Sequence, residues 1–587
     1  MKKAINIISL ALALLLLFSG CSKQSDVNSD TPADSAEPVT HDFAKTPEEM
    51  FTDRDFEIGY DVDTAIRIEL NEDNITCSSD SVTVSGTTAT ITKEATYIVE
   101  GALNDGQIIV EAPENAKLQI VLSDATVHCS FSAPLYIKEA DKVFVTLATG
   151  TSNSLTGGGE SALDGETTVD GSIFSKQDLT INGEGSLTVT SPAFHGIVCK
   201  DDLVITGGNY TVTSASHGLD ANDSIRIANA SITIDAGKDG MHAENNDDSP
   251  LGFVYFAGGN MTISAEGDGI SAGAYMQIDD GSFSIVTGGG SENSQKTTSD
   301  SYGGFMGGGP PSRPSRPSSS SSSSSTESGE SIKGLKAASG ILIGNGSFTI
   351  NSADDSLHSN ADLTINGGSY TISAGDDALH ADETLTVTSA IMNISESYEG
   401  IEGLHVKIMG GNVTLNADDD GINAAGGTDS SGYGGGRGDM FGSSSSKGSI
   451  EISGGTLNIT ASGDGLDANG TLSISGGYIT VCGPNTGDTA TLDYDVSGII
   501  TGGTFIGTGA SGMAQTFSQS NQGVISVSVG SISAQTPITL SDKDGNVILS
   551  ATPQLAYSVV ILSSPSIKSG ETFVLTVGTT SKEFKAS

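Results

Sequence analysis

The chain has 587 residues with 72 acidic and 26 basic side chains, which gives a formal net charge of −46 at pH 7. This charge repels nucleic-acid phosphates and attracts divalent cations, so we expect no nucleic-acid partner. Glycine is abundant at 76 residues, Trp is absent, and only 17% of the residues are charged, which excludes a helical or coiled-coil protein.

The first twenty residues have the pattern of a targeting segment. Residues 2–3 are basic, residues 8–17 are apolar, and Cys21 follows a Ser-Gly pair. This pattern resembles a bacterial lipoprotein signal, in which the cysteine is freed by cleavage and lipid-modified; an ordinary secretory signal is the alternative. We therefore expect residues 1–20 to be a lipoprotein signal peptide. Lipidation of Cys21 would anchor the exported protein to the bacterial cell membrane, facing outward.

The chain after the signal changes from a polar linker to regular strands. Residues 21–64 are polar and acidic and are expected to form a flexible tether. From residue 65, short alternating runs such as residues 107–110 and 118–122 are separated by turn residues and predict β-strands. Helices are not expected, because glycine recurs too densely and no stripe of period 3.6 persists.

An internal repeat decides the predicted fold class. The pattern Gly-(Ile/Leu/Met)-x-Ala, with close variants, recurs from Gly196 to Gly465, and Gly196, Gly218 and Gly240 are 22 residues apart. Short strands and glycine-rich turns at this period are typical of a parallel β-helix. We therefore predict an all-β protein, with a right-handed parallel β-helix of about 22-residue coils over residues 65–480.

Two inserts and a C-terminal region depart from the repeat. Low-complexity stretches at about 288–331 and 426–447 lengthen the interval between repeats and are expected to leave the coil as loops. The period fades after residue 480, so residues 481–587 are predicted to form a small C-terminal β cap. Four further cysteines lack CxxC spacing and are expected to be free thiols, a Cys77–Cys129 disulfide being the alternative: Cys77, Cys129, Cys199 and Cys482.

Stacked coils would bring carboxylates into a column. Asp355, Asp377, Glu399 and Asp420 fall on the same turn of successive repeats, and neighbouring coils lie ~4.8 Å apart. Such carboxylates repel one another by roughly 1 kcal/mol per neighbour in a water-like dielectric, so they favour a counter-ion. Hard oxygen ligands favour calcium over zinc; a solvated acidic edge is the alternative. The predicted calcium ligands are Asp354, Asp355, Asp376, Asp377, Glu399, Glu402, Asp419, Asp420, Asp464 and Asp467.

Other polar residues share this region. Lys333 stands one coil upstream of Asp355 and is expected to supply positive charge at that end of the column. His242, His358 and His380 occupy the neighbouring position of their repeats. Three imidazoles could bind a transition metal, but packed or hydrogen-bonded turn residues are the simpler interpretation.

Taken in order, these motifs resemble the calcium-binding, carbohydrate-binding β-helix family of bacterial surface proteins, whose fold is similar to that of pectate lyases. The resemblance implies calcium on the acidic turns and a polysaccharide partner, including acidic, pectin-like glycans. Asp355-Ser356 and Asp377-Ala378 lack the glycine that is common at these turns. The residues that carry the resemblance are 333–337, 354–359, 376–382, 397–403, 418–427 and 464–470.

Two functions follow as expectations. The first is a cell-surface lipoprotein that binds an acidic glycan through structural calcium without cleaving it. The alternative is a calcium-dependent polyuronate lyase, in which Lys333 or Lys336 would remove a proton as the base. The absence of Trp favours acidic sugars bridged by calcium over crystalline cellulose, because neutral sugars commonly stack on exposed aromatic rings. A purely structural surface spacer is a third option.

Overall fold

Short strands that pair in parallel make up most of the protein. The computed structural model describes residues 36–157, 159, 161–294, 331–425, 447–487 and 489–587. Contacts divide the chain into residues 1–33 and 34–587, and every element described below belongs to the second unit. The predicted signal peptide and Cys21 lie outside the described residues.

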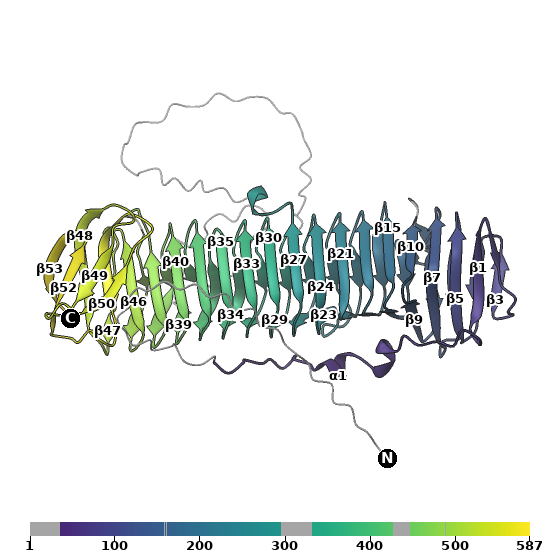
Figure 1. Cartoon of the computed structure of the whole chain (residues 1–587), viewed down its shortest axis with the longest axis horizontal. Helices are drawn as coiled ribbons and strands as arrows, with labels where there is room; N and C mark the ends of the chain where they lie inside the picture. The colour runs from purple at the N-terminus through teal and green to yellow at the C-terminus, as the bar shows by residue number, and fades with distance from the viewer. Residues whose placement is uncertain (1–35, 158, 160, 295–330, 426–446, 488) are drawn as a thin grey trace, which may run out of the picture. The chain divides into compact units, whose positions relative to one another are not determined.

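The strands of successive repeats stack in register. In one row, β28 (Leu335–Ala337), β31 (Leu357–Ser359), β34 (Leu379–Val387) and β36 (Ile401–Ile408) pair in parallel, and Leu335 faces Leu357, which faces Leu379. Figure 1 shows strands that follow one another in chain order through this unit. The predicted all-β class is confirmed, and the long, mainly parallel sheet is compatible with a β-helix. Its handedness and coil size stay predictions.

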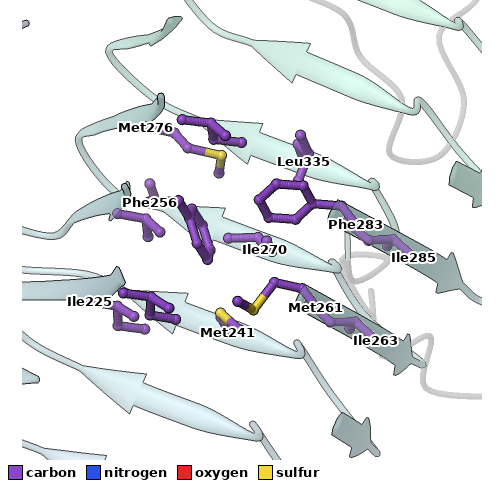
Figure 2. Close-up of a cluster of buried hydrophobic side chains, with 14 of the residues drawn as sticks. Ile225, Met241, Phe256, Met261, Ile263, Ile270, Met276, Phe283, Ile285 and Leu335 are labelled. Carbon is purple, nitrogen blue, oxygen red and sulfur yellow. The ribbon is translucent and has the colours of Figure 1, made fainter. Parts of the chain in front are cut away.

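Alternating side chains fill the interior between the rows. In β30 (Ser347–Ser352) and β33 (Ser369–Ala374) every second residue is buried, and the rings of Phe348 and Tyr370 stack with centroids 4.7 Å apart. Figure 2 shows the same arrangement farther upstream, where Phe283 packs toward Ile270. Each such side chain stabilises the fold by about 1.5–3 kcal/mol through burial, so the ladder of apolar side chains holds the coils together.

The glycine of the repeat is required by close packing. A Cβ atom at Gly269 would lie 2.5 Å from the carbonyl oxygen of Gly334 and 2.6 Å from Cγ2 of Ile285. Real Cβ atoms do not approach a carbonyl oxygen so closely, so this turn accepts only hydrogen. Close packing therefore requires glycine at this turn, although Ser356 and Ala378 occupy the same position in two other repeats.

Residues 36–57 form a strap along one face, named here the N-terminal strap. It contains α1 (Pro47–Met50) and the 3₁₀ turn Asp53–Phe56. Asn366 donates to the carbonyl of Val39 at 2.7 Å and accepts its N–H at 2.8 Å. Gln277 makes the same two bonds with Lys45, both at 2.8 Å.

The strap ends on a buried carboxylate. Asp55 is 1% exposed, accepts a hydrogen bond from Thr180 at 2.6 Å and lies 3.0 Å from Nζ of Lys142. The prediction of a flexible tether over residues 21–64 is therefore corrected for residues 36–57. Side chains of the sheet hold this segment by hydrogen bonds to its backbone. The sequence carries no signal for this, because the partners are far away along the chain.

The C-terminal region combines parallel and antiparallel pairing. Parallel pairing continues past the predicted boundary at residue 480, because β46 (Thr504–Gly509) still pairs in parallel with β43 (Tyr478–Cys482). A separate antiparallel sheet follows, made of four strands: β49 (Ile538–Ser541), β50 (Val547–Ala551), β52 (Thr572–Val577) and β53 (Thr580–Lys585).

The start of the first insert is ordered against the sheet. The backbone N–H of Ser291 donates to Oδ1 of Asn351 at 2.7 Å, and Oγ of Ser294 donates to the carbonyl of Gly375 at 2.6 Å. Residues 288–294 of the predicted loop at 288–331 therefore pack against the sheet, whereas residues 295–330 and most of the second insert lie outside the described residues. Among described residues, no helix has the length and apolar character needed to cross a membrane. Cys77, Cys129, Cys199 and Cys482 are free thiols, as predicted.

Candidate functional site

Two neighbouring columns of polar side chains run along one turn of the stack. The turn column consists of the residues that directly precede the repeat glycine, or the residue that replaces this glycine, in successive repeats. The strand column consists of the residues three positions after the members of the turn column. In every member of the turn column the backbone carbonyl accepts a hydrogen bond from the backbone N–H of the repeat glycine, or its equivalent, in the preceding coil. The turn column comprises His217, Asp239, Asp268, Lys333, Asp355, Asp377, Glu399, Asp420 and Asp464. The strand column comprises Asp220, His242, Ser271, Lys336, His358, His380, Glu402, Asn423 and Asp467, which are direct strand partners.

One oxygen of most turn-column aspartates has a structural task; the exception is buried Asp377, whose Oδ1 has no hydrogen-bond partner among the described residues. Oδ1 of Asp268 accepts the backbone N–H of Lys333 at 2.7 Å, and Oδ1 of Asp355 accepts that of Asp377 at 3.0 Å. The carboxylate thus satisfies a buried backbone donor of the next coil, which would otherwise cost free energy. The sequence analysis did not predict this task. The one feature that could have indicated it is the fixed position of aspartate before the repeat glycine. The second oxygen is left to interact with the strand column.

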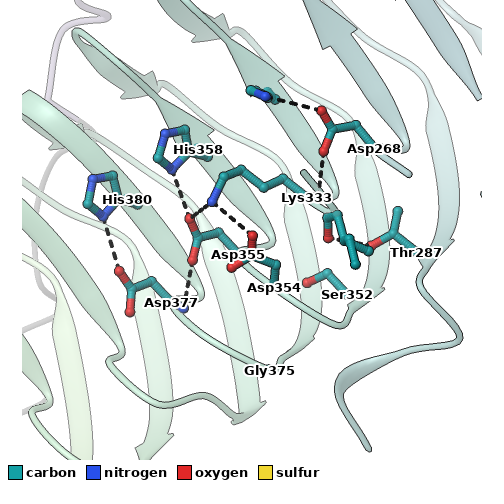
Figure 3. Close-up of polar contacts among 12 residues, drawn as sticks. Asp268, Thr287, Lys333, Ser352, Asp354, Asp355, His358, Gly375, Asp377 and His380 are labelled. Carbon is teal, nitrogen blue, oxygen red and sulfur yellow. Dashed lines mark hydrogen bonds and ion pairs between the residues drawn. The ribbon is translucent and has the colours of Figure 1, made fainter. Parts of the chain in front are cut away.

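Lys333 neutralises the upstream part of the predicted calcium site. Its Nζ lies 2.5 Å from Oδ2 of Asp355 and 3.2 Å from Oδ2 of Asp354, and Lys333 is 4% exposed (Figure 3). Nδ1 of His358 lies 2.8 Å from the same oxygen of Asp355. Burial by itself raises the pKa of Asp355, but the charge of Lys333 and the hydrogen bond with His358 outweigh it and hold this pKa below its usual value. The predicted role of Lys333 as a source of positive charge fits this geometry.

The same contacts make both lysines unsuited to act as a base. Deprotonation of Lys333 would leave the buried carboxylate of Asp355 without its partner, and the burial of Lys333 keeps it away from a solvent-borne polymer. Lys336 is more accessible, but its Nζ lies 3.4 Å from Oδ2 of Asp268, a buried carboxylate. Both side chains therefore act here as counter-ions of aspartates.

The middle of the columns uses an imidazole. Nδ1 of His380 lies 3.0 Å from Oδ2 of Asp377 and 2.9 Å from Oε2 of Glu402 (Figure 3 shows the first contact). Burial lowers the pKa of His380, but its hydrogen bonds with Asp377, Asp382 and Glu402 outweigh burial and raise it. Burial, together with the charges of Asp376 and Glu402, raises the pKa of Asp377 well above its usual value. A proton on His380 therefore offsets part of the negative charge here.

The downstream end of the columns gathers several carboxylates. Asp420, Asp464 and Asp467 each place a carboxylate oxygen within 4.8 Å of the others. Burial and the charges of Glu399, Asp419 and Asp464 raise the pKa of Asp420 to about 9. Burial, with the charges of Asp464 and Asp493, raises the pKa of Asp467 to about 7. Neighbouring carboxylates thus contribute to both raised pKa values, and a divalent cation bound among them would relieve their repulsion.

The ten predicted calcium ligands therefore fall into unlike surroundings. Four of them, Asp354, Asp355, Asp377 and Glu402, contact Lys333 or a histidine, whereas Asp420, Asp464 and Asp467 form an oxygen-only group. Asp354 and Asp355 also form a group with Asp376, and Glu399 accepts a hydrogen bond from Asn423 at 2.8 Å. A further group, His217, Asp239 and His242, lies upstream and outside the predicted ligand set.

Comparison with known proteins identifies the family. A family model described as "Carbohydrate-binding domain-containing protein" matches residues 85–378 and 376–581, which include both columns. The chain belongs to this carbohydrate-binding domain-containing family. A carbohydrate-binding domain-containing protein of Acetivibrio thermocellus is 42% identical over 225 residues, which cover 38% of this chain and 77% of that protein.

A solved structure is also similar to this member of the family. It is titled as a polysaccharide lyase-like protein from C. thermocellum, in a gadolinium derivative, and is 34% identical to this chain. The match covers 38% of this chain and 92% of the other, with a TM-score of 0.37. The family model confirms the predicted resemblance for the carbohydrate-binding domain, whereas calcium binding and the likeness to pectate lyases stay predictions.

Proposed function

We propose that this protein is an outward-facing, lipid-anchored surface protein that binds an acidic, pectin-like polysaccharide through calcium held on the two columns, without cleaving it. Membership of a carbohydrate-binding domain family supports the polysaccharide partner. The lipid anchor at Cys21 and the export of the protein are supported by the signal pattern of residues 1–21.

The group of Asp420, Asp464 and Asp467 carries the calcium proposal. Three carboxylates with oxygens within 4.8 Å of one another form a hard, oxygen-only donor set, which suits calcium better than zinc. Oδ1 of Asp420 is already bonded to the backbone N–H of Asp464 at 2.5 Å, so the coil fixes the position of this carboxylate before an ion arrives. Preorganised ligands lose little conformational entropy on binding.

The exposure of this group supports a bridging ion. All three aspartates are only partly buried, so an ion held there keeps coordination positions open toward solvent. A protein of net charge −46 repels a polyuronate unless cations lie between the two. Calcium that is coordinated by the columns on one side and by uronate carboxylates on the other would remove this repulsion.

Cleavage is the weaker candidate. A uronate lyase needs a base with an available lone pair next to the metal. The two lysines considered for this role are bonded to Asp355 and Asp268, and Lys333 is buried. This arrangement favours binding over proton abstraction.

The test is affinity electrophoresis through gels that contain polygalacturonate or a neutral glucan, run with calcium or with EGTA. We expect retardation by polygalacturonate in calcium only, and strong loss of retardation in Asp467→Asn. The matched control is Asp544→Asn, which makes the same charge change at an exposed turn of the C-terminal sheet and should be retarded like wild type. Equal retardation of Asp467→Asn and wild type would contradict the proposal. Growth of unsaturated-uronate absorbance during incubation would favour the lyase instead.

A further inference from the structure

The two halves of the N-terminal strap are attached to the sheet in different ways. Residues 50–57 include three buried side chains, Met50, Phe51 and Asp55. Each of residues 36–46, by contrast, is at least partly exposed, and hydrogen bonds and ring contacts hold this part. Segments with few buried apolar contacts open at low free-energy cost. Residues 36–46, which we name the cover segment, can therefore leave the sheet while residues 50–57 stay in place.

The cover segment lies on one row of parallel strands. Its contacts fall on or next to β26 (Tyr275–Ile278), β29 (Gly340–Ile343) and β32 (Leu363–Ile365), and Figure 1 shows the strap in purple passing along this row. Gln277 and Thr364 lie beneath it and are 4% and 1% exposed. The segment therefore shields polar side chains of the row from solvent.

A ring of the cover segment takes a place that the row leaves empty. The rings of Phe253 and Tyr275 stack with centroids 4.9 Å apart, but the next strand partner of Tyr275 is Gly340, which has no side chain. Phe43 fills this place: its ring stacks on Tyr275 at 4.9 Å, and a Cβ atom at Gly340 would lie 2.9 Å from Cε1 of Phe43. Sugar rings commonly stack on aromatic faces, so Tyr275 offers such a face once Phe43 leaves.

Two amide side chains of the row bind the backbone of the cover segment. Asn366 donates to the carbonyl of Val39 at 2.7 Å and accepts its N–H at 2.8 Å. Gln277 makes the same pair of bonds with Lys45. These bonds use no side chain of the segment. A sugar hydroxyl is both a donor and an acceptor, so the two amides can bind hydroxyls in place of this backbone.

The row continues past the cover segment into an open hollow. Thr364 is the strand partner of Thr386, which in turn faces Lys407 on β36, two coils downstream of β32. A cavity of about 190 Å³ lies at this point of the row. Its lining includes Lys407, Glu451, Ser453 and Ser473. The hollow and the covered strands therefore form one track along which an extended chain can lie.

We propose that residues 36–46 cover a second polysaccharide-binding surface, from which an extended glycan displaces them. In the open state a sugar ring stacks on Tyr275, Gln277 and Asn366 bind hydroxyls, and the glycan continues into the hollow at Lys407. The inference rests on the proposed function for its ligand, an acidic polysaccharide, but it uses a different strand row from the calcium columns. The rival is a purely structural cover segment that never leaves the sheet.

The test compares two substitutions that break the same ring contact. Phe43→Ala and Tyr275→Ala both remove the stacked pair and should loosen the cover segment to a similar extent, but only Phe43→Ala leaves a ring for a sugar. In affinity electrophoresis through polygalacturonate with calcium, we expect Phe43→Ala to bind about tenfold more tightly than wild type, because less of it is covered. Tyr275→Ala should bind no more tightly than wild type. No gain in Phe43→Ala, or an equal gain in both variants, would overturn the proposal.

Hydrogen exchange of the wild-type protein follows the displacement itself. The backbone N–H groups of Val39 and Lys45 are bonded to the two amides of the row, so they should exchange about tenfold faster or more when a galacturonate oligomer is bound in calcium. The N–H of Thr52, which donates to buried Asp55 at 2.9 Å, is the internal control and should keep its rate. Unchanged protection of Val39 and Lys45 in the bound state would overturn the proposal even if Phe43→Ala folds poorly.

The same gels separate this surface from the calcium columns. Phe43→Ala combined with Asp467→Asn should still bind more tightly than Asp467→Asn alone. If wild type is retarded and Phe43→Ala gains nothing, the cover proposal fails and the column proposal stands. If Phe43→Ala is retarded and wild type is not, the cover proposal stands and the column proposal fails. If neither protein is retarded, both proposals are overturned.

Discussion

Replacing Asp467 with Asn should stabilise the calcium-free protein, and calcium should remove most of that advantage. In the folded protein, burial and the charges of Asp464 and Asp493 raise the pKa of Asp467 to about 7, whereas an unfolded Asp titrates near 3.8. The proton is therefore bound more tightly in the folded state. Its contribution to stability is complete below the unfolded value and is lost as the pH rises through the folded value.

The size of the effect follows from the two pKa values. The difference between about 7 and 3.8 corresponds to roughly 4 kcal/mol in the calcium-free protein above neutral pH. Asn cannot ionise, so Asp467→Asn keeps this stability and should be more stable than wild type in EGTA. With calcium the advantage of the variant should shrink to roughly 1–2 kcal/mol, because wild type gains about 2.7 kcal/mol at a calcium concentration of 100 times Kd, whereas the variant has lost a ligand and gains less.

Scanning calorimetry in EGTA and in calcium, at about pH 5 and about pH 8, measures all four conditions through Tm. We expect Asp467→Asn to melt above wild type in EGTA near pH 8, with a smaller difference near pH 5, and to respond weakly to calcium. Asp544→Asn should follow wild type throughout. A variant that melts below wild type in EGTA near pH 8, or that gains as much from calcium as wild type does, would refute this reasoning.

Four further predictions follow from the other contacts. Lys333→Met should lower stability by about 3–5 kcal/mol, because it leaves buried Asp355 without its cation; an unchanged denaturation midpoint would contradict the ion pair. Asp55→Ala should lower the free energy of unfolding by about 2–4 kcal/mol, because it leaves Lys142 without its partner and releases the N-terminal strap. Proteolysis before residue 57 should then be faster than in wild type, and an equal rate would contradict the role of Asp55 in holding the strap. Deleting residues 295–330 while keeping 288–294 should leave Tm nearly unchanged, since loop length adds little closure entropy; loss of folding would refute it. Cys21→Ser should move the protein from the membrane fraction to the soluble fraction, and a variant that stays in the membrane fraction would disprove lipidation.

The sequence predicts the stacked rows because their cause is local and repeated. Between the inserts an inward Leu recurs every 22 residues at Leu335, Leu357 and Leu379, and the structure pairs these residues as that interval requires. The same regularity brings the acidic residues together. The N-terminal strap has no such period, and its partners Gln277 and Asn366 lie more than 200 residues away, so it could not be foreseen.

The sequence predicts which acidic residues come together in the candidate site, but it does not predict which of them are paired with a lysine or a histidine. The repeat pattern gives all ten predicted ligands the same status. It does not reveal that Lys333 contacts both Asp354 and Asp355. Nor does it reveal that His380 contacts both Asp377 and Glu402. These contacts depend on side-chain directions across neighbouring coils. The contacts of Asp239 with His217 and His242 could not be predicted for the same reason.

The central claim is that calcium on the columns mediates binding of an acidic glycan. Isothermal titration of the wild-type protein with a galacturonate oligomer, in calcium and then in EGTA, tests it most directly. The account predicts saturable heat in calcium that disappears in EGTA and returns when calcium is restored. Equal affinity in both buffers, or no binding in calcium, would contradict it.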